Sequence, residues 1–211
     1  MRSDLHGLYA VTPDEPSLAR LAALVEAVVT QGVRLVQYRN KQGGPLAHRV
    51  QAAELLRVCR SHGARLIVND DVDLAIAIGA DGVHVGRDDL GGRDLGVVRS
   101  MLGPDRLLGV SCYDDLARVD VARAAGVDYI GIGSMFPSTT KPSARSASFE
   151  VLSESRRRFG GPVAAIGGIT LANAPQVIAA GADMVAVIGD LFGVDDVGCR
   201  AQEFQKLFNP K

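Results

Sequence analysis

One local pattern recurs along the whole sequence: a helix-forming segment, a glycine, one or two small or charged residues, and then an apolar run. The glycine stands where a helix commonly ends in a left-handed residue. The apolar runs do not alternate with polar residues, which is typical of parallel strands buried on both faces. The pattern therefore predicts alternating helices and buried parallel strands. The glycines are Gly32, Gly63, Gly79, Gly126 and Gly181.

About eight strand–helix units fit into the 211 residues, which favours an α/β fold, a closed (β/α)8 barrel or TIM barrel, as a single catalytic domain over 1–211. An open doubly wound sheet is the alternative, because such a count can slip by one unit. The expected strands cover 7–12, 33–39, 64–70, 80–86, 106–111, 127–133, 162–168 and 182–189. The expected helices cover 17–30, 46–61, 72–78, 94–102, 114–125, 149–159, 171–180 and about 194–207.

Composition narrows the class of protein. A net charge of −1 and a pI near 6.4 give no support for binding nucleic acid or an anionic membrane. The 3 cysteines are far apart and lack metal-binding spacing, as in reduced cytoplasmic proteins. An apolar run begins by Leu5, so we expect no signal peptide, and no run reaches the roughly 18 residues of a membrane span. We expect a cytoplasmic protein whose partners are small molecules; a homo-oligomer stays open.

Polar residues follow the expected strands, and in such a barrel catalytic residues lie at these strand ends. Gln37, Arg39 and Lys41 end the second strand and fall on one side of it by side-chain alternation. Two cations and an amide donor can bind a multiply charged anion. Ser111 ends the fifth strand and adds a hydroxyl. Together, Arg39, Lys41, Asn69 and Lys141 can surround one polyphosphate.

Carboxylates follow the third and fourth strands. Asn69, Asp70 and Asp71 end the third, and Asp89 follows the fourth. Asp70 and Asp89 offer the hard oxygen ligands that Mg²⁺ prefers, and the ion would bridge protein and phosphate oxygens. The alternative for Asp70 or Asp71 is to cap the next helix.

A second anion site is predicted after the later strands. The sixth strand leads into Ser138, Thr139, Thr140 and Lys141, which offer hydroxyls and one charge. Glycines that end the seventh and eighth strands, Gly168 and Gly189, can present backbone N–H groups to a smaller phosphate. The alternatives are an ordinary polar loop and a simple glycine turn.

Two other residues invite a chemical role. His84, within the fourth strand, is interpreted as a packed or supporting residue rather than a ligand. Cys112 has no activating base nearby in the sequence, which argues against a nucleophile. Without a nucleophile and its base, the residues favour displacement of a pyrophosphate, catalysed by charge neutralisation and positioning.

Several motifs occur in order: QYRNK, ND, GVHVGRDD, GVS, GSMFPSTTKPSA and AIGGI. With them the chain resembles the thiamine phosphate synthase family over nearly its whole length. The resemblance implies a TIM barrel that joins 4-amino-2-methyl-5-pyrimidinylmethyl diphosphate to 4-methyl-5-(2-phosphoethyl)thiazole, with Mg²⁺. It implies that the diphosphate substrate is bound by Gln37, Arg39, Lys41, Asn69, Ser111 and Lys141, of which Arg39, Lys41, Ser111 and Lys141 would be catalytic.

By the same resemblance, Asp70 and Asp89 hold Mg²⁺, and the thiazole phosphate is bound by Ser138, Thr139, Thr140, Gly168, Ile188 and Gly189. The sequence departs from the family at Gly189 and Asp190, where the family more often has serine followed by a small residue. A carboxylate beside a phosphate would repel it unless it turns outward or caps a short helix. Two alternatives remain: a thiazole tautomerase of the same fold, and a non-catalytic phosphate-binding regulator. Neither explains why the cations and the acidic pair occur together.

Overall fold

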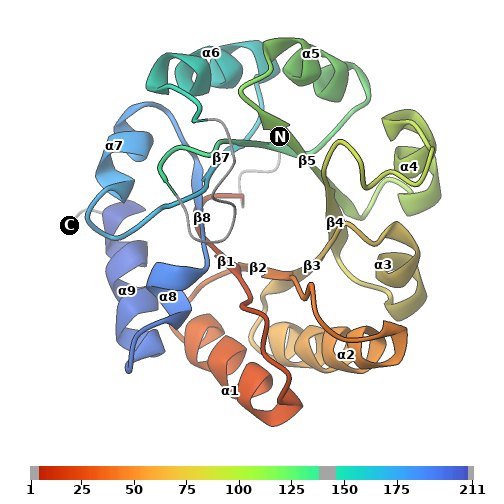
Figure 1. Cartoon of the computed structure of the whole chain (residues 1–211), viewed down its shortest axis with the longest axis vertical. Helices are drawn as coiled ribbons and strands as arrows, with labels where there is room; N and C mark the ends of the chain where they lie inside the picture. Colours follow the sequence, from red (N-terminus) through yellow and green to blue (C-terminus); the bar gives the residue numbers. More distant parts are fainter. Residues whose placement is uncertain (1–4, 138–145, 209–211) are drawn as a thin grey trace.

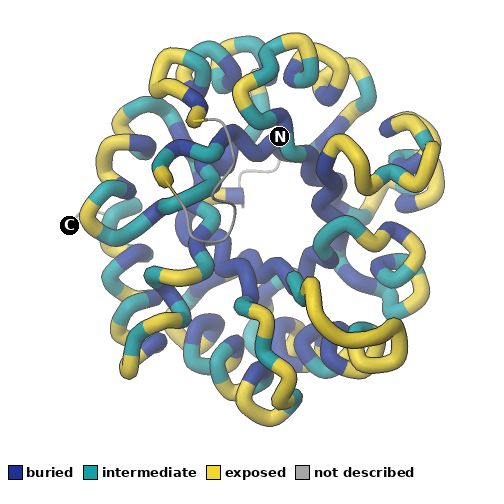
Figure 2. The backbone as a smooth tube through the Cα atoms, in the orientation of Figure 1, coloured by how far each residue is buried: buried dark blue, intermediate teal, exposed yellow. Residues whose placement is uncertain are grey.

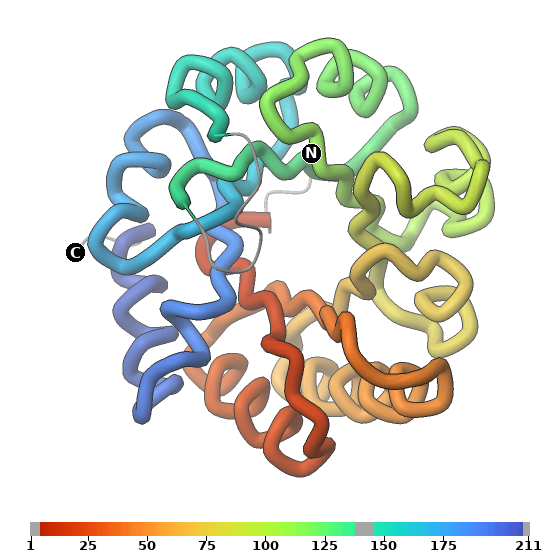
Figure 3. Tube along the Cα trace, viewed as in Figure 1, coloured from red at the N-terminus to blue at the C-terminus, as the bar shows by residue number. Residues whose placement is uncertain are grey.

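The computed structural model describes residues 5–137 and 146–208, and these form a closed barrel of parallel strands surrounded by helices (Figure 1). The strands follow one another around the barrel in sequence order, and β1 pairs with β8 to close it. The closure is visible in Figure 3, where the red start of the trace lies against the blue end. The predicted (β/α)8 barrel is confirmed, and the open sheet is excluded.

The strands are β1 (Gly7–Val11), β2 (Leu35–Tyr38), β3 (Arg65–Asn69), β4 (Gly82–Val85), β5 (Leu107–Tyr113), β6 (Tyr129–Ile132), β7 (Val163–Ile166) and β8 (Met184–Val187). The helices are α1 (Leu18–Val29), α2 (Pro45–Ser61), α3 (Val72–Ile78), α4 (Leu95–Leu102), α5 (Leu116–Ala124), α6 (Phe149–Phe159), α7 (Ala174–Ala179), α8 (Gly189–Phe192) and α9 (Val197–Phe208).

The strands carry apolar side chains on both faces, which explains why their sequences do not alternate. One set fills the barrel interior and includes Tyr9, Ile67 and Tyr129. The larger set lies between the strands and the helices. Figure 2 shows the consequence, a buried ring of strands inside a shell whose exposed residues face outward. Gly109 makes room for the interior rings, since a Cβ there would collide with Tyr129 and would lie 2.6 Å from Nδ1 of His84.

The predicted helix ends are confirmed. Gly32, Gly63, Gly79, Gly126 and Gly181 all have φ values between 66° and 103°, the left-handed region in which glycine is not strained. Each therefore reverses the chain from a helix into the next strand.

The helices of the seventh and eighth strand–helix units differ from the prediction. The helix expected over 171–180 is shorter, because Asn173 accepts from the N–H of Thr170 and forms a turn before α7. The segment after β8 folds into the short helix α8 before α9 begins, which the sequence pattern had not separated. Strand β5 continues to Tyr113, past a bulge between Ser111 and Tyr113.

The rim at which the strands begin is fastened by a repeated contact. An aspartate just before each of β4, β6 and β8 accepts a hydrogen bond from a backbone N–H of the preceding strand. Each carboxylate also pairs with an arginine on an earlier helix. The contacts are Leu66 N to Asp81 (2.8 Å), Leu108 N to Asp128 (2.8 Å) and Val163 N to Asp183 (2.9 Å), and the arginines are Arg60, Arg99 and Arg156.

At β1 the same role falls to a residue from the far end of the chain. The side chain of Gln205, on α9, accepts from the N–H of Leu8 at 3.2 Å and donates to the carbonyl of Gly32 at 3.0 Å. The last helix therefore links β1 to the turn that precedes β2. Within the described residues, none of the helices has the length and apolarity that crossing a membrane requires.

Candidate active site

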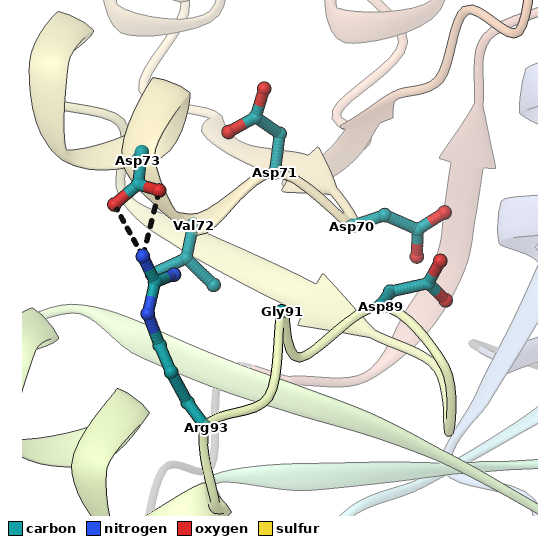
Figure 4. A pocket seen from close by; sticks show the side chains of 7 residues that line it. All are labelled: Asp70, Asp71, Val72, Asp73, Asp89, Gly91 and Arg93. Carbon is teal, nitrogen blue, oxygen red and sulfur yellow. Dashed lines mark hydrogen bonds and ion pairs between the residues drawn. The ribbon is translucent and has the colours of Figure 1, made fainter.

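Two carboxylates meet at the rim where strands end. Asp70 directly follows β3 and Asp89 lies in the loop after β4, and both line one open pocket. Figure 4 shows their side chains next to each other, whereas Asp73 turns away to pair with Arg93 at 2.9 Å. Burial and the adjacent charge of Asp70 raise the pKa of Asp89 above its usual value. The pair is thus a concentration of negative charge that a cation would relieve.

The backbone at Asp70 is held in an unusual conformation. Its φ is 65°, a left-handed value that is uncommon for a residue other than glycine. In this position its carboxylate accepts hydrogen bonds from Lys41 Nζ at 2.6 Å and Asn69 Nδ2 at 2.5 Å. Asp71, in contrast, is the N-cap of α3 and accepts from the N–H of Leu74 at 2.8 Å. The capping alternative therefore applies to Asp71 and not to Asp70.

The loop that carries Asp89 is held by contacts with Tyr113, the last residue of β5. A Cβ on Gly86 would collide with the carboxylate of Asp89 and would lie 3.0 Å from the hydroxyl of Tyr113. The N–H of Arg87 donates to that hydroxyl at 3.3 Å, and the guanidinium of Arg87 lies 5.8 Å above the ring of Tyr113. The glycine thus allows Asp89 to fold back toward the strand ends.

The cations after β2 are organised by an acid that sequence analysis did not select. Asp14 follows β1 and accepts from the backbone N–H of Lys41 at 2.7 Å and from the guanidinium of Arg39 at 3.4 Å. Thr12 also bonds the backbone of Arg39, at 2.9 and 3.0 Å. Because β2 ends at Tyr38, these loop contacts place Arg39 and Lys41, and strand alternation does not. The signal for Asp14 was its position in the loop after a strand, three residues beyond the end of β1.

Gln37 and Ser111 are joined through the barrel interior by a chain of hydrogen bonds. Gln37 Nε2 donates to Tyr9 Oη at 2.6 Å, Tyr9 Oη lies 2.7 Å from Tyr129 Oη, Tyr129 Oη lies 3.2 Å from His84 Nδ1, and His84 Nε2 lies 2.8 Å from Ser111 Oγ. His84 is buried, so the interpretation as a supporting residue is consistent with its place. Sequence analysis missed both tyrosines. Cys112 is buried between the strands and the helices, and burial raises its pKa to about 12, as in an unreactive thiol.

The glycines after β7 allow another segment to pass close to them. Gly167 and Gly168 have φ values of 88° and 63°. A Cβ on Gly168 would collide with the carbonyl of Pro137 and lie 2.7 Å from that of Phe136. The N–H of Phe136 donates to Gly167 at 3.1 Å, so the segment after β6 runs along the end of β7. The predicted residues Ser138, Thr139, Thr140 and Lys141 come next and lie outside the described residues.

Ile188 lies between β8 and α8, and Gly189 is the first residue of α8. The strand that leads to them, β8, is paired with β7. Asp190 does not stand free at this point. Its carboxylate accepts from the N–H of Leu171 at 2.9 Å and pairs with Arg200 at 2.7 Å. Because Arg200 neutralises its charge, the repulsion between this aspartate and a bound phosphate is reduced.

The donor set at Asp70 and Asp89 fits a hard divalent cation. Carboxylate oxygens are the ligands of Mg²⁺, which commonly takes one or two of them and fills its remaining positions with substrate oxygens and water. Among residues 5–137 and 146–208, no group of three or more His, Cys, Asp or Glu side chains is arranged to hold a metal.

The barrel, with cations and carboxylates gathered where its strands end, defines a (β/α)8-barrel enzyme. The family model for thiamine monophosphate synthase matches residues 8–191. The chain therefore belongs to the thiamine monophosphate synthase family and is an enzyme of thiamine biosynthesis.

Relatives support this placement over the whole chain. The thiamine-phosphate synthase of Azoarcus sp. (strain BH72) is 50% identical over 99% of this chain and 100% of its own length. That of Methylobacillus flagellatus is 47% identical over 97% of this chain and 96% of its own. Among solved structures, thiamine phosphate pyrophosphorylase from Pyrococcus furiosus is similar with a TM-score of 0.85 and 30% identity, covering 97% of this chain and 96% of that one.

Proposed function

We propose that this enzyme joins 4-amino-2-methyl-5-pyrimidinylmethyl diphosphate to 4-methyl-5-(2-phosphoethyl)thiazole, yielding thiamine phosphate and diphosphate, with Mg²⁺ as its cofactor. The observation that supports the proposal most is the pair Asp70 and Asp89, which line one pocket, with Lys41 against Asp70. Asp14 contacts both Lys41 and the second cation, Arg39. Carboxylates and cations on one rim suit a substrate that arrives as a metal-bound polyanion. A site for a single phosphate would not need the acidic pair.

The reaction needs no catalytic base. The ring nitrogen of the thiazole has a free lone pair, which forms the new bond to the pyrimidine methylene carbon. The bond from that carbon to the diphosphate oxygen breaks, and the electron pair leaves with the diphosphate. The amino group of the pyrimidine delocalises positive charge from the methylene, so we expect a dissociative path in which the carbon–oxygen bond breaks early.

The protein would then catalyse the reaction by binding the two substrates and by neutralising the charge of the leaving diphosphate. Arg39 and Lys41 would hold the diphosphate and stabilise the charge that develops as it leaves. Lys41 reaches Asp70 at 2.6 Å, so it already lies beside the carboxylates that would hold Mg²⁺. Bound Mg²⁺ supplies further neutralisation of the leaving group. Asn69 and Ser111 would orient the same substrate from β3 and β5.

The thiazole phosphate would bind across the mouth, at the ends of β6, β7 and β8. Gly168, Ile188 and Gly189 would receive it through backbone groups, together with Ser138, Thr139 and Thr140. Lys141 would lie between the two phosphate sites. These four loop residues lie outside the described residues, and their roles follow from the sequence pattern and the family resemblance.

The test is to mix both phosphorylated substrates with the purified protein, with Mg²⁺ or with excess EDTA, and to measure thiamine phosphate and diphosphate. We expect both products in equal amounts, and only when Mg²⁺ is present. An isomerised thiazole without diphosphate release would instead identify a tautomerase. Binding of phosphate without any conversion would identify a regulator.

A further inference from the structure

The hydrogen-bonded chain that crosses the barrel interior has a definite direction, which can be found by counting protons. Its five members, Gln37, Tyr9, Tyr129, His84 and Ser111, make four successive contacts. Each contact uses one proton. Tyr9 and Tyr129 are 1% and 0% exposed, and burial raises the pKa of both hydroxyls above the usual value. Both tyrosines are therefore protonated, and each has one proton to donate.

Gln37 sets the direction at one end. Its Nε2 faces Tyr9 at 2.6 Å, and an amide nitrogen can only donate. Tyr9 thus accepts from Gln37 and can pass its own proton to Tyr129. Tyr129 can in turn pass its proton to Nδ1 of His84. The remaining proton of the imidazole then lies on Nε2 and points to Ser111, whose own proton is left for another partner.

Every other direction of these hydrogen bonds leaves a buried hydroxyl proton without an acceptor in the chain. If Tyr129 donated to Tyr9, the proton of Tyr9 would have no acceptor among the described residues. If Nδ1 of His84 carried a proton, it would donate to Tyr129, and again one tyrosine proton would be left over. A buried donor without a partner costs about 1–3 kcal/mol. Only one order satisfies both tyrosines, and it leaves the spare proton on Ser111, which is partly exposed.

We propose that His84 is held as the neutral tautomer protonated on Nε2, and that it thereby makes Ser111 a hydrogen-bond donor toward the pyrimidine diphosphate. Tyr9, Tyr129 and His84 are positioning residues that act through Ser111. The identity of the ligand that accepts from Ser111 rests on the proposed function, whereas the tautomer of His84 does not. A ligand group that accepts a hydrogen bond is favoured at Ser111, and one that can only donate is disfavoured.

The direct test is NMR of the protein with ¹⁵N-labelled histidine. The chain has 4 histidines, and a His84→Gln variant identifies the signals of His84 by their loss. We expect a protonated nitrogen that couples to both ring hydrogens, which is Nε2, and an unprotonated Nδ1. A proton on Nδ1, or on both nitrogens, would overturn the proposal. An Nε2 proton in an enzyme that makes no thiamine phosphate would refute the proposed function alone.

A second test uses Tyr129→Phe, which keeps the ring and removes the hydroxyl. The hydrogen bond from Tyr129 to Nδ1 is then lost, so the tautomer protonated on Nε2 should be less favoured and Ser111 should donate inward for part of the time. We expect kcat/KM for the pyrimidine diphosphate to fall about tenfold, the value of one hydrogen bond. Ser111→Ala should fall at least as far, and adding Tyr129→Phe to it should cause little further loss. Fully additive losses would show that the tyrosine does not act through Ser111.

The matched control is Tyr38→Phe. The Tyr38 hydroxyl is also buried and donates a hydrogen bond, to Gln51 at 2.9 Å, but it is not part of the chain. This variant removes a comparable buried contact and should leave the tautomer of His84 unchanged. A changed tautomer in the control would mean that His84 responds to general loosening of the barrel, which would count against the proposal.

Discussion

The carboxylates Asp70 and Asp89 lie in an arrangement that is unfavourable without a positive partner. Asp70 has a left-handed backbone with a φ of 65°, and its charge helps raise the pKa of Asp89. Lys41 offsets part of the repulsion at 2.6 Å from Asp70. Local strain of this kind is typical of binding sites, because the ligand supplies the missing compensation.

Replacing Asp89 by Asn should therefore affect stability and activity in opposite directions. Without Mg²⁺, the variant should unfold at a higher urea concentration at pH 7, because one repulsive charge is gone. The pKa of Asp89 is raised in the folded state, so its charged form costs stability above that pKa. The gain from Asp89→Asn should accordingly disappear below about pH 4, near the unperturbed pKa of aspartate. Turnover should fall about 100-fold, because the leaving diphosphate is less neutralised.

Asp88→Asn is the control for this prediction. Asp88 is exposed in the same loop and does not line the pocket with Asp70 and Asp89. It should change neither stability nor turnover appreciably. If Asp89→Asn turned over normally and kept its full Mg²⁺ dependence, the assignment of Asp89 to the metal would be wrong.

Single residues were predictable where their position after a strand was enough. The sequence selected Asp70 and Asp89 in this way, and the structure places both on one rim of the barrel. Ser111, expected at the end of the fifth strand, lies within β5. Tyr9 and Tyr129 could not be found, because a tyrosine in an apolar strand is equally consistent with a packed side chain. Their role depends on side chains from five strands meeting in the barrel interior, which no local pattern contains.

At the scale of elements, the glycines after β7 do more than end a strand. Gly168 has a φ of 63°, and a Cβ there would collide with the carbonyls of Pro137 and Phe136. The segment after β6 can approach β7 only because this side chain is missing. The course of the loop that leads to the proposed thiazole-phosphate site thus depends on Gly168.

Gly168→Ala should destabilise the protein by two effects, strain and collision. Gly126→Ala separates them, because Gly126 has a similar φ of 67° and no atom within 4 Å of an added Cβ. We expect urea unfolding to show a loss of about 1 kcal/mol for Gly126→Ala from strain alone. Gly168→Ala should lose a further ~2 kcal/mol from overpacking and raise KM for the thiazole phosphate. Equal losses in the two variants would mean that the neighbouring segment moves aside freely.

The eight strands and most helices followed from the sequence, because each glycine signal and each apolar run is local. The short helix α8 and the late start of α7 did not. Both depend on side chains that bond backbone groups, Asn173 within its own turn and Asp190 across to Leu171. Such bonds are decided by the packed structure, and propensity alone does not specify them.

At the scale of the whole molecule, the rim with Asp81, Asp128 and Asp183 lies at the opposite ends of the strands from the catalytic groups. Asp128→Ala should leave Leu108 N–H and Arg99 without this acceptor, and we expect the free energy of unfolding to fall by about 2–3 kcal/mol. The kcat of the folded fraction should stay unchanged. Asp120→Ala removes an exposed ion pair with Arg158 and should cost at most about 0.5 kcal/mol in the same denaturation experiment. A similar loss in both would show that the rim contact adds nothing beyond a surface ion pair.

The contact of Gln205 with β1 has a consequence for how the protein is made. The strand pairs β3–β4, β5–β6 and β7–β8 are each joined by an aspartate that is close by in the sequence. The side chain that accepts from the N–H of Leu8, in contrast, comes 197 positions later. During synthesis on the ribosome, the first two strands therefore emerge long before the helix that secures them. A nascent chain must keep this edge from pairing with other chains until its final helix appears. Loss of that helix should release β1 first, which faster hydrogen exchange at the amide of Leu8 would reveal.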